Sequence, residues 1–145
     1  MKNKIYYVIH HRSTSVGPEH LQQLKEFFGY LKLNTDVNIL LENVAGIPLS
    51  DYLSTCKRIG ITPPRMCIDT AHISAGGDKL EDIPNGVGFI HLNGNQTEPG
   101  SKSDKHTECN SKQDTCFTSK DMLKEFVKKF SDAVLILERR HEDDK

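Results

Sequence analysis

Several features that would assign the chain to a class at once are absent from its sequence. No apolar run approaches the ~20 residues that a membrane-spanning helix needs, and the opening M-K-N-K-I lacks the apolar stretch of a secretory signal. The formal net charge of −1 gives no global attraction to nucleic acid, so any such binding must come from a local patch. We therefore expect neither a membrane partner nor a secreted protein.

The chain also lacks C-x-x-C spacing. Its four cysteines, Cys56, Cys67, Cys109 and Cys116, are expected to be reduced thiols in a cytosolic or nuclear compartment, with a Cys109–Cys116 bridge as the alternative. At 145 residues, 36% hydrophobic and with a mean hydropathy of −0.53, the chain is polar but foldable. This length allows one core, so we expect residues 1–145 to form a single domain.

Short strand-like apolar runs alternate with longer stretches of helical periodicity. The pattern predicts strands over 5–9, 37–41, 65–68, 86–92 and 133–137. It predicts helices that begin near Pro18, over 49–59, and from an N-cap at Ser119 to Phe130. Residues 93–118 are predicted to form a long polar loop.

This alternation favours an α/β fold with a parallel sheet and helical crossovers. About five of the eight strands of a (β/α)₈ barrel are present, and a complete barrel takes ~200 to 250 residues. We therefore expect a partial TIM barrel. Because unpaired sheet edges promote association, a second chain that completes the barrel is a possible partner.

Histidines and carboxylates follow the predicted strands. In a parallel sheet the carboxyl ends of the strands lie on one face, where active sites gather. Imidazole and carboxylate are usual zinc ligands, with manganese or iron possible, and a carboxylate can bridge two metals. The candidate metal ligands are His10, Glu42, Asp69, His72, His91, Asp104, His106 and Glu138.

Each candidate also has a purely structural interpretation. Asp69 could cap a following helix, Glu42 could be a solvated loop carboxylate, and Glu138 could form a surface ion pair of little energetic value. Taken together, these interpretations do not explain why the residues recur at one end of the strands. In the polar loop, Lys102 and Lys105 could contact DNA phosphates and Asn93 could donate a hydrogen bond, although a solvated loop is as good an interpretation of any one lysine.

The motifs resemble those of the endonuclease IV-type apurinic/apyrimidinic endonucleases, the AP endonuclease family 2, whose fold is a xylose-isomerase-like TIM barrel. The matching segments occur in family order, and the last has a form similar to that in members from large DNA viruses, so the resemblance makes a virus-encoded protein one expectation. They read L-E-N-V-A-G over 41–46, C-I-D-T-A-H over 67–72, F-I-H-L-N over 89–93, G-S-K-S-D-K-H over 100–106 and I-L-E-R over 136–139.

The resemblance implies base excision DNA repair, in which two or three zinc ions and a metal-bound hydroxide hydrolyse the phosphodiester on the 5′ side of an abasic site. Glu42 would bridge two metals and act, with Glu138, as a catalytic carboxylate. His10 would join Glu42 on the first metal, with His11 as the competing choice. The second metal would take Asp69, His91 and Glu138, and the third would take His72, Asp104 and His106.

The chain departs from the family pattern in ways that leave other functions open. The family's first three strands are not recognisable, and Gly94 stands where the family has an Asp. One alternative is a single-metal sugar isomerase or epimerase of the same superfamily, which would have no use for Asp104 and His106. Another is a truncated remnant that binds metal or DNA without cleaving it.

Overall fold

The computed structural model describes residues 5–10, 18–34 and 37–138. Five strands form one parallel sheet in the order β1-β2-β3-β4-β7, and two further strands, β5 and β6, form a small antiparallel sheet. The strands of the large sheet are β1 (Ile5–His10), β2 (Val37–Glu42), β3 (Met66–Asp69), β4 (Phe89–His91) and β7 (Val134–Ile136). The helices are α1 (Pro18–Asn34), α2 (Leu49–Ile59), α3 (Thr70–Gly76) and α4 (Lys120–Lys129), with short 3-10 turns η1 (Pro63–Arg65) and η2 (Leu80–Asp82).

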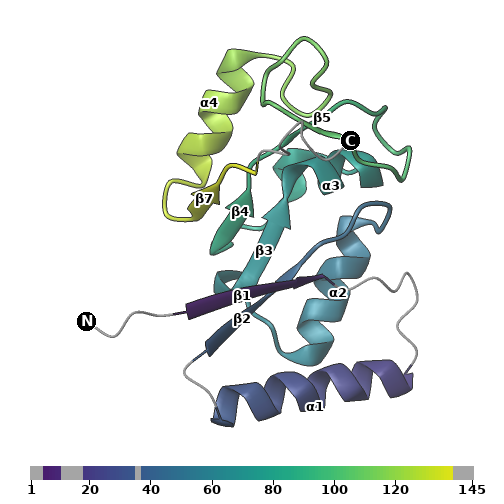
Figure 1. The fold of residues 1–145 in the computed structure, drawn as a ribbon, viewed down its shortest axis with the longest axis vertical. Helices are drawn as coiled ribbons and strands as arrows, with labels where there is room; N and C mark the ends of the chain where they lie inside the picture. The colour runs from purple at the N-terminus through teal and green to yellow at the C-terminus, as the bar shows by residue number, and fades with distance from the viewer. Residues whose placement is uncertain (1–4, 11–17, 35–36, 139–145) are drawn as a thin grey trace, which may run out of the picture.

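The sheet is curled, and the helices lie around its outside, so the chain forms a half-barrel (Figure 1). This confirms the predicted α/β class and the partial TIM barrel. The curl brings the two sides of the inner face together, since the rings of Tyr6 on β1 and Phe89 on β4 are 4.7 Å apart although two strands lie between them.

The outer face of the sheet packs against the helices and forms the core. In α2 the buried residues Leu49, Tyr52, Cys56 and Ile59 recur every three or four positions, which puts them on one face of the helix. The Tyr52 hydroxyl donates to the Leu41 carbonyl at 2.7 Å and so joins this helix to β2. The helix ends at Gly60, whose φ of 78° is the left-handed conformation that favours glycine.

The predicted strand over 86–92 is longer than the observed β4. The chain before Phe89 is held instead by η1: the Gly88 amide donates to the Pro63 carbonyl at 3.1 Å. A Cβ on Gly88 would lie 2.2 Å from the Pro64 carbonyl oxygen. This close approach of two backbone segments requires glycine and delays the start of the strand.

The prediction that 93–118 is a polar loop was wrong in part. The segment contains β5 (Gly94–Asn95) and β6 (His106–Thr107), and it buries Asn95, Asp114 and Phe117. Asp114 organises it: Oδ1 accepts from the amides of Asn95 and Cys116 at 3.1 and 2.8 Å, and Oδ2 accepts from the Asn110 amide at 2.6 Å. The segment is polar in composition and yet folded. Its buried Asp114 carboxylate is tolerated because both of its oxygens accept hydrogen bonds.

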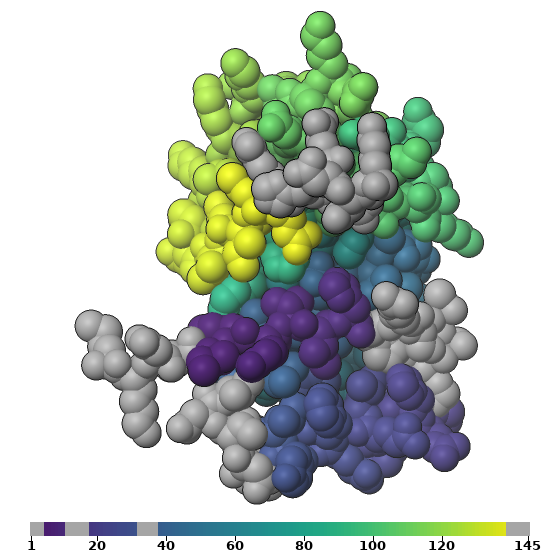
Figure 2. Space-filling view, in the orientation of Figure 1, coloured from purple at the N-terminus to yellow at the C-terminus, as the bar shows by residue number. Residues whose placement is uncertain are grey.

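Both edge strands of the half-barrel expose large apolar side chains. On β1 these are Ile5, Tyr6 and Tyr7, and at β7 they are Val134, Ile136 and Leu137. In the space-filling view β1 (purple) lies at the surface, with β7 (yellow) on the same side (Figure 2). None of the helices in the described ranges combines the length and the hydropathy of a membrane-spanning segment.

Candidate metal centre

Glu42, at the end of β2, lies at the centre of the candidate site. Its side chain is 1% exposed. His10 Nε2, from the neighbouring strand, is 2.9 Å from Glu42 Oε2, and His91 Nδ1, from β4, is 3.2 Å from Glu42 Oε1. The strand register explains the first contact, since His10 and Glu42 are paired residues of adjacent parallel strands. The alternative His11 lies outside the described residues.

Asp69 serves the fold and the site with different oxygens. Oδ1 accepts from the amides of Ala71 and His72 at 2.8 and 3.1 Å, so it caps α3 as its structural interpretation predicts. Oδ2 accepts from Asn93 Nδ2 at 2.8 Å and lies 3.6 Å from His106 Nε2. Capping therefore does not exclude metal binding: it fixes the carboxylate with one oxygen toward the histidine.

The 100–106 loop brings a second group to the same place. His106 Nε2 is 3.0 Å from Asp104 Oδ2, and His72 Nε2 is 3.7 Å from the same oxygen. His72 Nδ1 faces the Asn43 carbonyl at 2.8 Å, which orients the ring with Nε2 toward Asp104. Asp104 and His106 thus lie against the site.

Glu138 reaches the site from the strand end after β7. Its Oε1 is 3.4 Å from His91 Nδ1, and its Oε2 is 3.7 Å from His106 Nδ1. It pairs with imidazoles at the site rather than with the surface cation that its structural interpretation predicts. The structure therefore brings together all eight predicted ligands.

The spacing of these groups suits shared cations. Two ligands about 2.1 Å from one tetrahedral zinc ion lie about 3.4 Å apart, and the carboxylate–imidazole separations here range from 2.9 to 3.9 Å. Three groups of ligand atoms converge within 4.8 Å: Glu42, Cys67 and His91; Asp69, His72 and His106; and Asp69, His91 and Glu138.

Three buried polar atoms at or directly beneath the site lack a hydrogen bond within the described part of the chain: Glu42 Oε2, Asn93 Oδ1 and His106 Nε2. Glu42 Oε2 lies 2.9 Å from His10 Nε2, and His106 Nε2 lies 3.0 Å from Asp104 Oδ2, but neither pair has hydrogen-bond orientation. Since buried polar atoms are normally satisfied, and four carboxylates converge here, the donor set fits divalent cations.

The electrostatics of the site favour positive charge. Hydrogen bonding with the Cys67 side chain and with Glu42 raises the pKa of His91 to about 11, against the opposing effect of burial. A metal ion that binds His91 would therefore have to displace the proton of its imidazolium, because metals bind the neutral imidazole.

The predicted DNA contacts lie in two different environments. Asn93 is buried, and its amide is engaged with Asp69 beneath the site. Lys102 and Lys105 are exposed on either side of Asp104. The backbone holds this loop in place, because the Lys102 amide donates to the Ala75 carbonyl at 2.9 Å and the Lys105 amide donates to Asn95 Oδ1 at 2.9 Å.

Two residues of the site were missing from the sequence-based set. Cys67 lies close to Glu42 and His91. Its position two residues before Asp69 on the same strand indicates that both side chains point to the same face of the sheet. Asn43 joins two loops: its Oδ1 accepts from the Asp69 amide at 2.7 Å, and its Nδ2 donates to the Asp69 carbonyl at 3.2 Å. No local signal distinguishes this asparagine from an ordinary turn residue.

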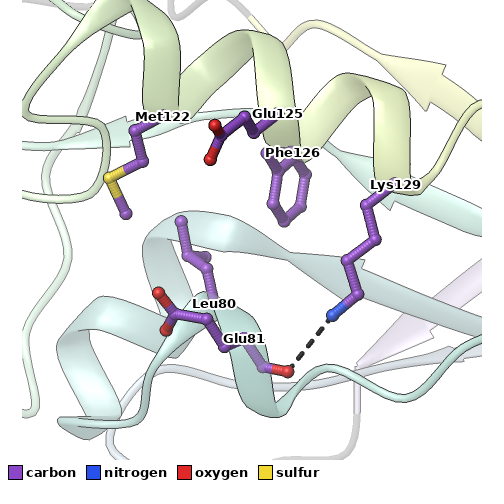
Figure 3. Close-up of a pocket in the computed structure, with 6 residues that line it drawn as sticks. All are labelled: Leu80, Glu81, Met122, Glu125, Phe126 and Lys129. Carbon is purple, nitrogen blue, oxygen red and sulfur yellow. Dashed lines mark hydrogen bonds between the residues drawn. The ribbon is translucent and has the colours of Figure 1, made fainter.

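A separate hollow lies between η2 and α4 and shares no residue with the site (Figure 3). Lys129 crosses it, and its Nζ donates to the carbonyls of Glu81 and Ile83 at 3.1 and 3.3 Å. These two hydrogen bonds engage the Lys129 ammonium group and connect α4 to η2 across the hollow. It is lined by Leu80, Glu81, Met122, Glu125, Phe126 and Lys129.

The fold and the site together define an α/β half-barrel with a histidine–carboxylate cluster at the carboxyl ends of its strands. No protein-family model matches the chain. The chain is 33% identical over 95 residues to the "Probable endonuclease 4" of Mycobacterium tuberculosis (strain ATCC 25177 / H37Ra). The matched region covers 57% of this chain and 38% of that protein. A protein of the same description from Mycobacterium marinum is 31% identical over 88 residues, 52% of this chain and 35% of the relative. The matched part thus spans less than two fifths of these relatives. They are bacterial, and the likeness to viral members stays a prediction.

Proposed function

We propose that the chain carries the metal centre of an endonuclease IV-type apurinic/apyrimidinic endonuclease that hydrolyses DNA on the 5′ side of an abasic site. The observation that carries this proposal is the convergence of eight imidazole and carboxylate groups at the strand ends of a half-barrel. The similarity to proteins described as endonuclease 4 supports the same family.

The proposed ligand roles are those that the resemblance implies. Glu42 would be shared between two ions, His10 would join it on the first, and Asp69, His91 and Glu138 would hold the second. His72, Asp104 and His106 would hold a third ion. When bound, two to three zinc ions would activate water and neutralise the phosphodiester. The pairing of Asp104 with His106 favours this reading over a single-metal isomerase, which needs fewer ligands.

The chain's own residues would hold the ligands in place and recognise the phosphates. Asn43 hydrogen-bonds the Asp69 backbone, and Asn93 Nδ2 donates to the Asp69 carboxylate, so both hold Asp69 in place before any ion arrives. Exposed Lys102 and Lys105 flank Asp104, where they would contact the DNA backbone on either side of the cut. Such phosphate contacts are independent of base sequence, which suits an enzyme that recognises a missing base.

The proposal includes a second chain that supplies the remaining strands. His10 and Glu138, the ligands from the two edge strands, are 52% and 44% exposed, whereas Glu42 between them is 1% exposed. A segment that paired with β1 and β7 would cover both ligands and the apolar edge side chains. In hydrogen exchange the amides of β1 in the chain alone should exchange faster than those of β3. Equal protection would contradict an open edge.

The test of the nuclease is cleavage of a duplex with one abasic site. The product should carry a 3′-hydroxyl that a DNA polymerase extends, and chelator should abolish the reaction. Glu42→Gln should lower the rate by several orders of magnitude, whereas Glu98→Gln, an exposed loop carboxylate, should leave it unchanged. A product that polymerase cannot extend, or a Glu42→Gln variant as active as the parent, would refute the assignment.

A further inference from the structure

Asn95, on β5, is fully buried, and each of its polar groups has a partner. Its amide donates to Asp114 Oδ1 at 3.1 Å, and its carbonyl accepts from the Thr115 amide at 2.7 Å and from the Thr115 hydroxyl at 3.0 Å. Its Oδ1 accepts from the Lys105 amide at 2.9 Å, and its Nδ2 donates to Thr97 Oγ1 at 2.9 Å. A buried amide costs free energy unless it is paired. Here the pairing joins the segments around Lys105 and Asp114 through one residue.

The bond to Lys105 falls between two proposed metal ligands, Asp104 and His106. Asn95 Oδ1 binds the Lys105 amide, and the Gln96 amide donates to the Lys105 carbonyl at 2.9 Å. The register of β5 and β6 pairs Asn95 with His106. Both backbone groups of Lys105 are thus held by residues 95 and 96, so β5 sets the positions of the two ligands that flank this lysine.

Asp114 holds Asn95 in turn. Its carboxylate packs directly against Gly94, where a Cβ would lie 2.7 Å from Asp114 Cγ. The carboxylate cannot move away without breaking its hydrogen bonds to three backbone amides, one of which is the Asn95 amide. A side chain at position 94 would therefore release Asn95. This close approach explains why glycine stands where the endonuclease IV-type pattern has an Asp.

We propose that Asn95 is a positioning residue for the ion that His72, Asp104 and His106 would hold. The inference rests on the proposed function, since it concerns one ion of that centre. Asn95 acts without contacting the ion: it fixes the Lys105 backbone and so places the ligands on either side. Residues that orient metal ligands in this way commonly change metal affinity about 10- to 100-fold when they are substituted.

The effect of Asn95 should be confined to one ion. His10, Glu42 and His91 reach the site from strands of the large sheet, whose register does not depend on residues 94–107. The ions on these ligands should keep their affinity when Asn95 is altered. A general loss of structure would weaken all ions together, so the number of ions affected separates positioning from a purely structural role.

Zinc titration of the full chain in metal buffers, with bound zinc counted by elemental analysis, tests the proposal. Asn95→Ala should weaken one ion about 10- to 100-fold and leave the others unchanged. Asn95→Asp keeps an oxygen for the Lys105 amide, and the Thr97 hydroxyl can donate to its second oxygen, so it should restore that ion. Ser119→Ala is the matched control, because it also removes a side-chain oxygen that accepts a backbone amide, at the start of α4. It should bind every ion as the parent does.

The outcomes separate this inference from the proposed function. A parent chain that binds no zinc would remove the metal centre itself. A folded Asn95→Ala that binds all ions as the parent does, or loses all of them, would overturn the inference while the centre stands. So would an Asn95→Asp that binds no better than Asn95→Ala.

Hydrogen exchange in the metal-free parent gives a readout that does not depend on whether a variant folds. The Lys105 amide should exchange more slowly than the amide of Ser103, an exposed residue of the same loop whose amide makes only a 3.4 Å contact with Ser101 Oγ. Equal exchange at Lys105 and Ser103 would show that Asn95 does not hold the loop, and would overturn the proposal.

Discussion

Asn43→Ala should destabilise the fold by more than an ordinary loop substitution. The buried Asn43 side chain makes two hydrogen bonds with the Asp69 backbone, at 2.7 and 3.2 Å. Each such bond contributes about 1 kcal/mol, and the Asp69 amide left unsatisfied would add about 1 kcal/mol more. We therefore expect a loss of about 3 kcal/mol in the free energy of unfolding, which for a domain of this size lowers Tm by about 6 to 12 °C.

Urea unfolding of the chelator-treated chain measures this directly, because without metal the loss reports the hydrogen bonds alone. Asn85→Ala is the matched control, since it removes the same side chain at an exposed turn and should change stability by less than about 0.5 kcal/mol. If Asn43→Ala were as stable as this control, the connection between the loops after β2 and β3 would not hold Asp69 in place.

Two further predictions concern the fold. Gly88→Ala should prevent normal folding, because the new Cβ would lie 2.2 Å from the Pro64 carbonyl oxygen. Gly29→Ala, which has open space in α1, should instead stabilise the fold by up to about 1 kcal/mol. Thermal melting followed by circular dichroism compares the two variants, and a stable Gly88→Ala would contradict the close approach. Burial raises the pKa of Cys56 from 9.0 to about 11 and of Cys116 to about 12. Since unfolded thiols ionise first, stability should be complete below pH 8 and fall as pH rises from 9 toward 11, by about 3 kcal/mol from Cys56 alone. Stability that stays constant over this window would contradict the buried neutral thiols.

The order of the five strands of the large sheet and of α1, α2 and α4 was predictable because apolar periodicity dominates it, whereas α3 entered only through the capping interpretation of Asp69, and β5 and β6 were not predicted. The helix over 49–59 was predicted with its observed bounds, since its buried face recurs regularly and Gly60 ends it. The start of β4, three residues later than predicted, was not predictable in this way. It depends on the contact of Gly88 with Pro64, a tertiary approach that strand propensity does not contain.

The gathering of candidate residues at the site followed from topology, because parallel strands place their carboxyl ends on one face. The groups held by long-range contacts did not follow. Asn43 and Asp114 are polar residues in irregular segments, and their importance comes from backbone partners that only the fold brings close. The roles of the eight ligands, and of Asn93, Lys102 and Lys105 toward DNA, remain predictions.

Zinc stoichiometry tests the central claim most directly. The purified chain, stripped with chelator and dialysed against excess zinc, should retain two or more ions per molecule by elemental analysis, and Glu42→Gln should retain fewer. A parent chain that retains no zinc would contradict the account, because four carboxylates and four imidazoles would then converge without sharing a cation.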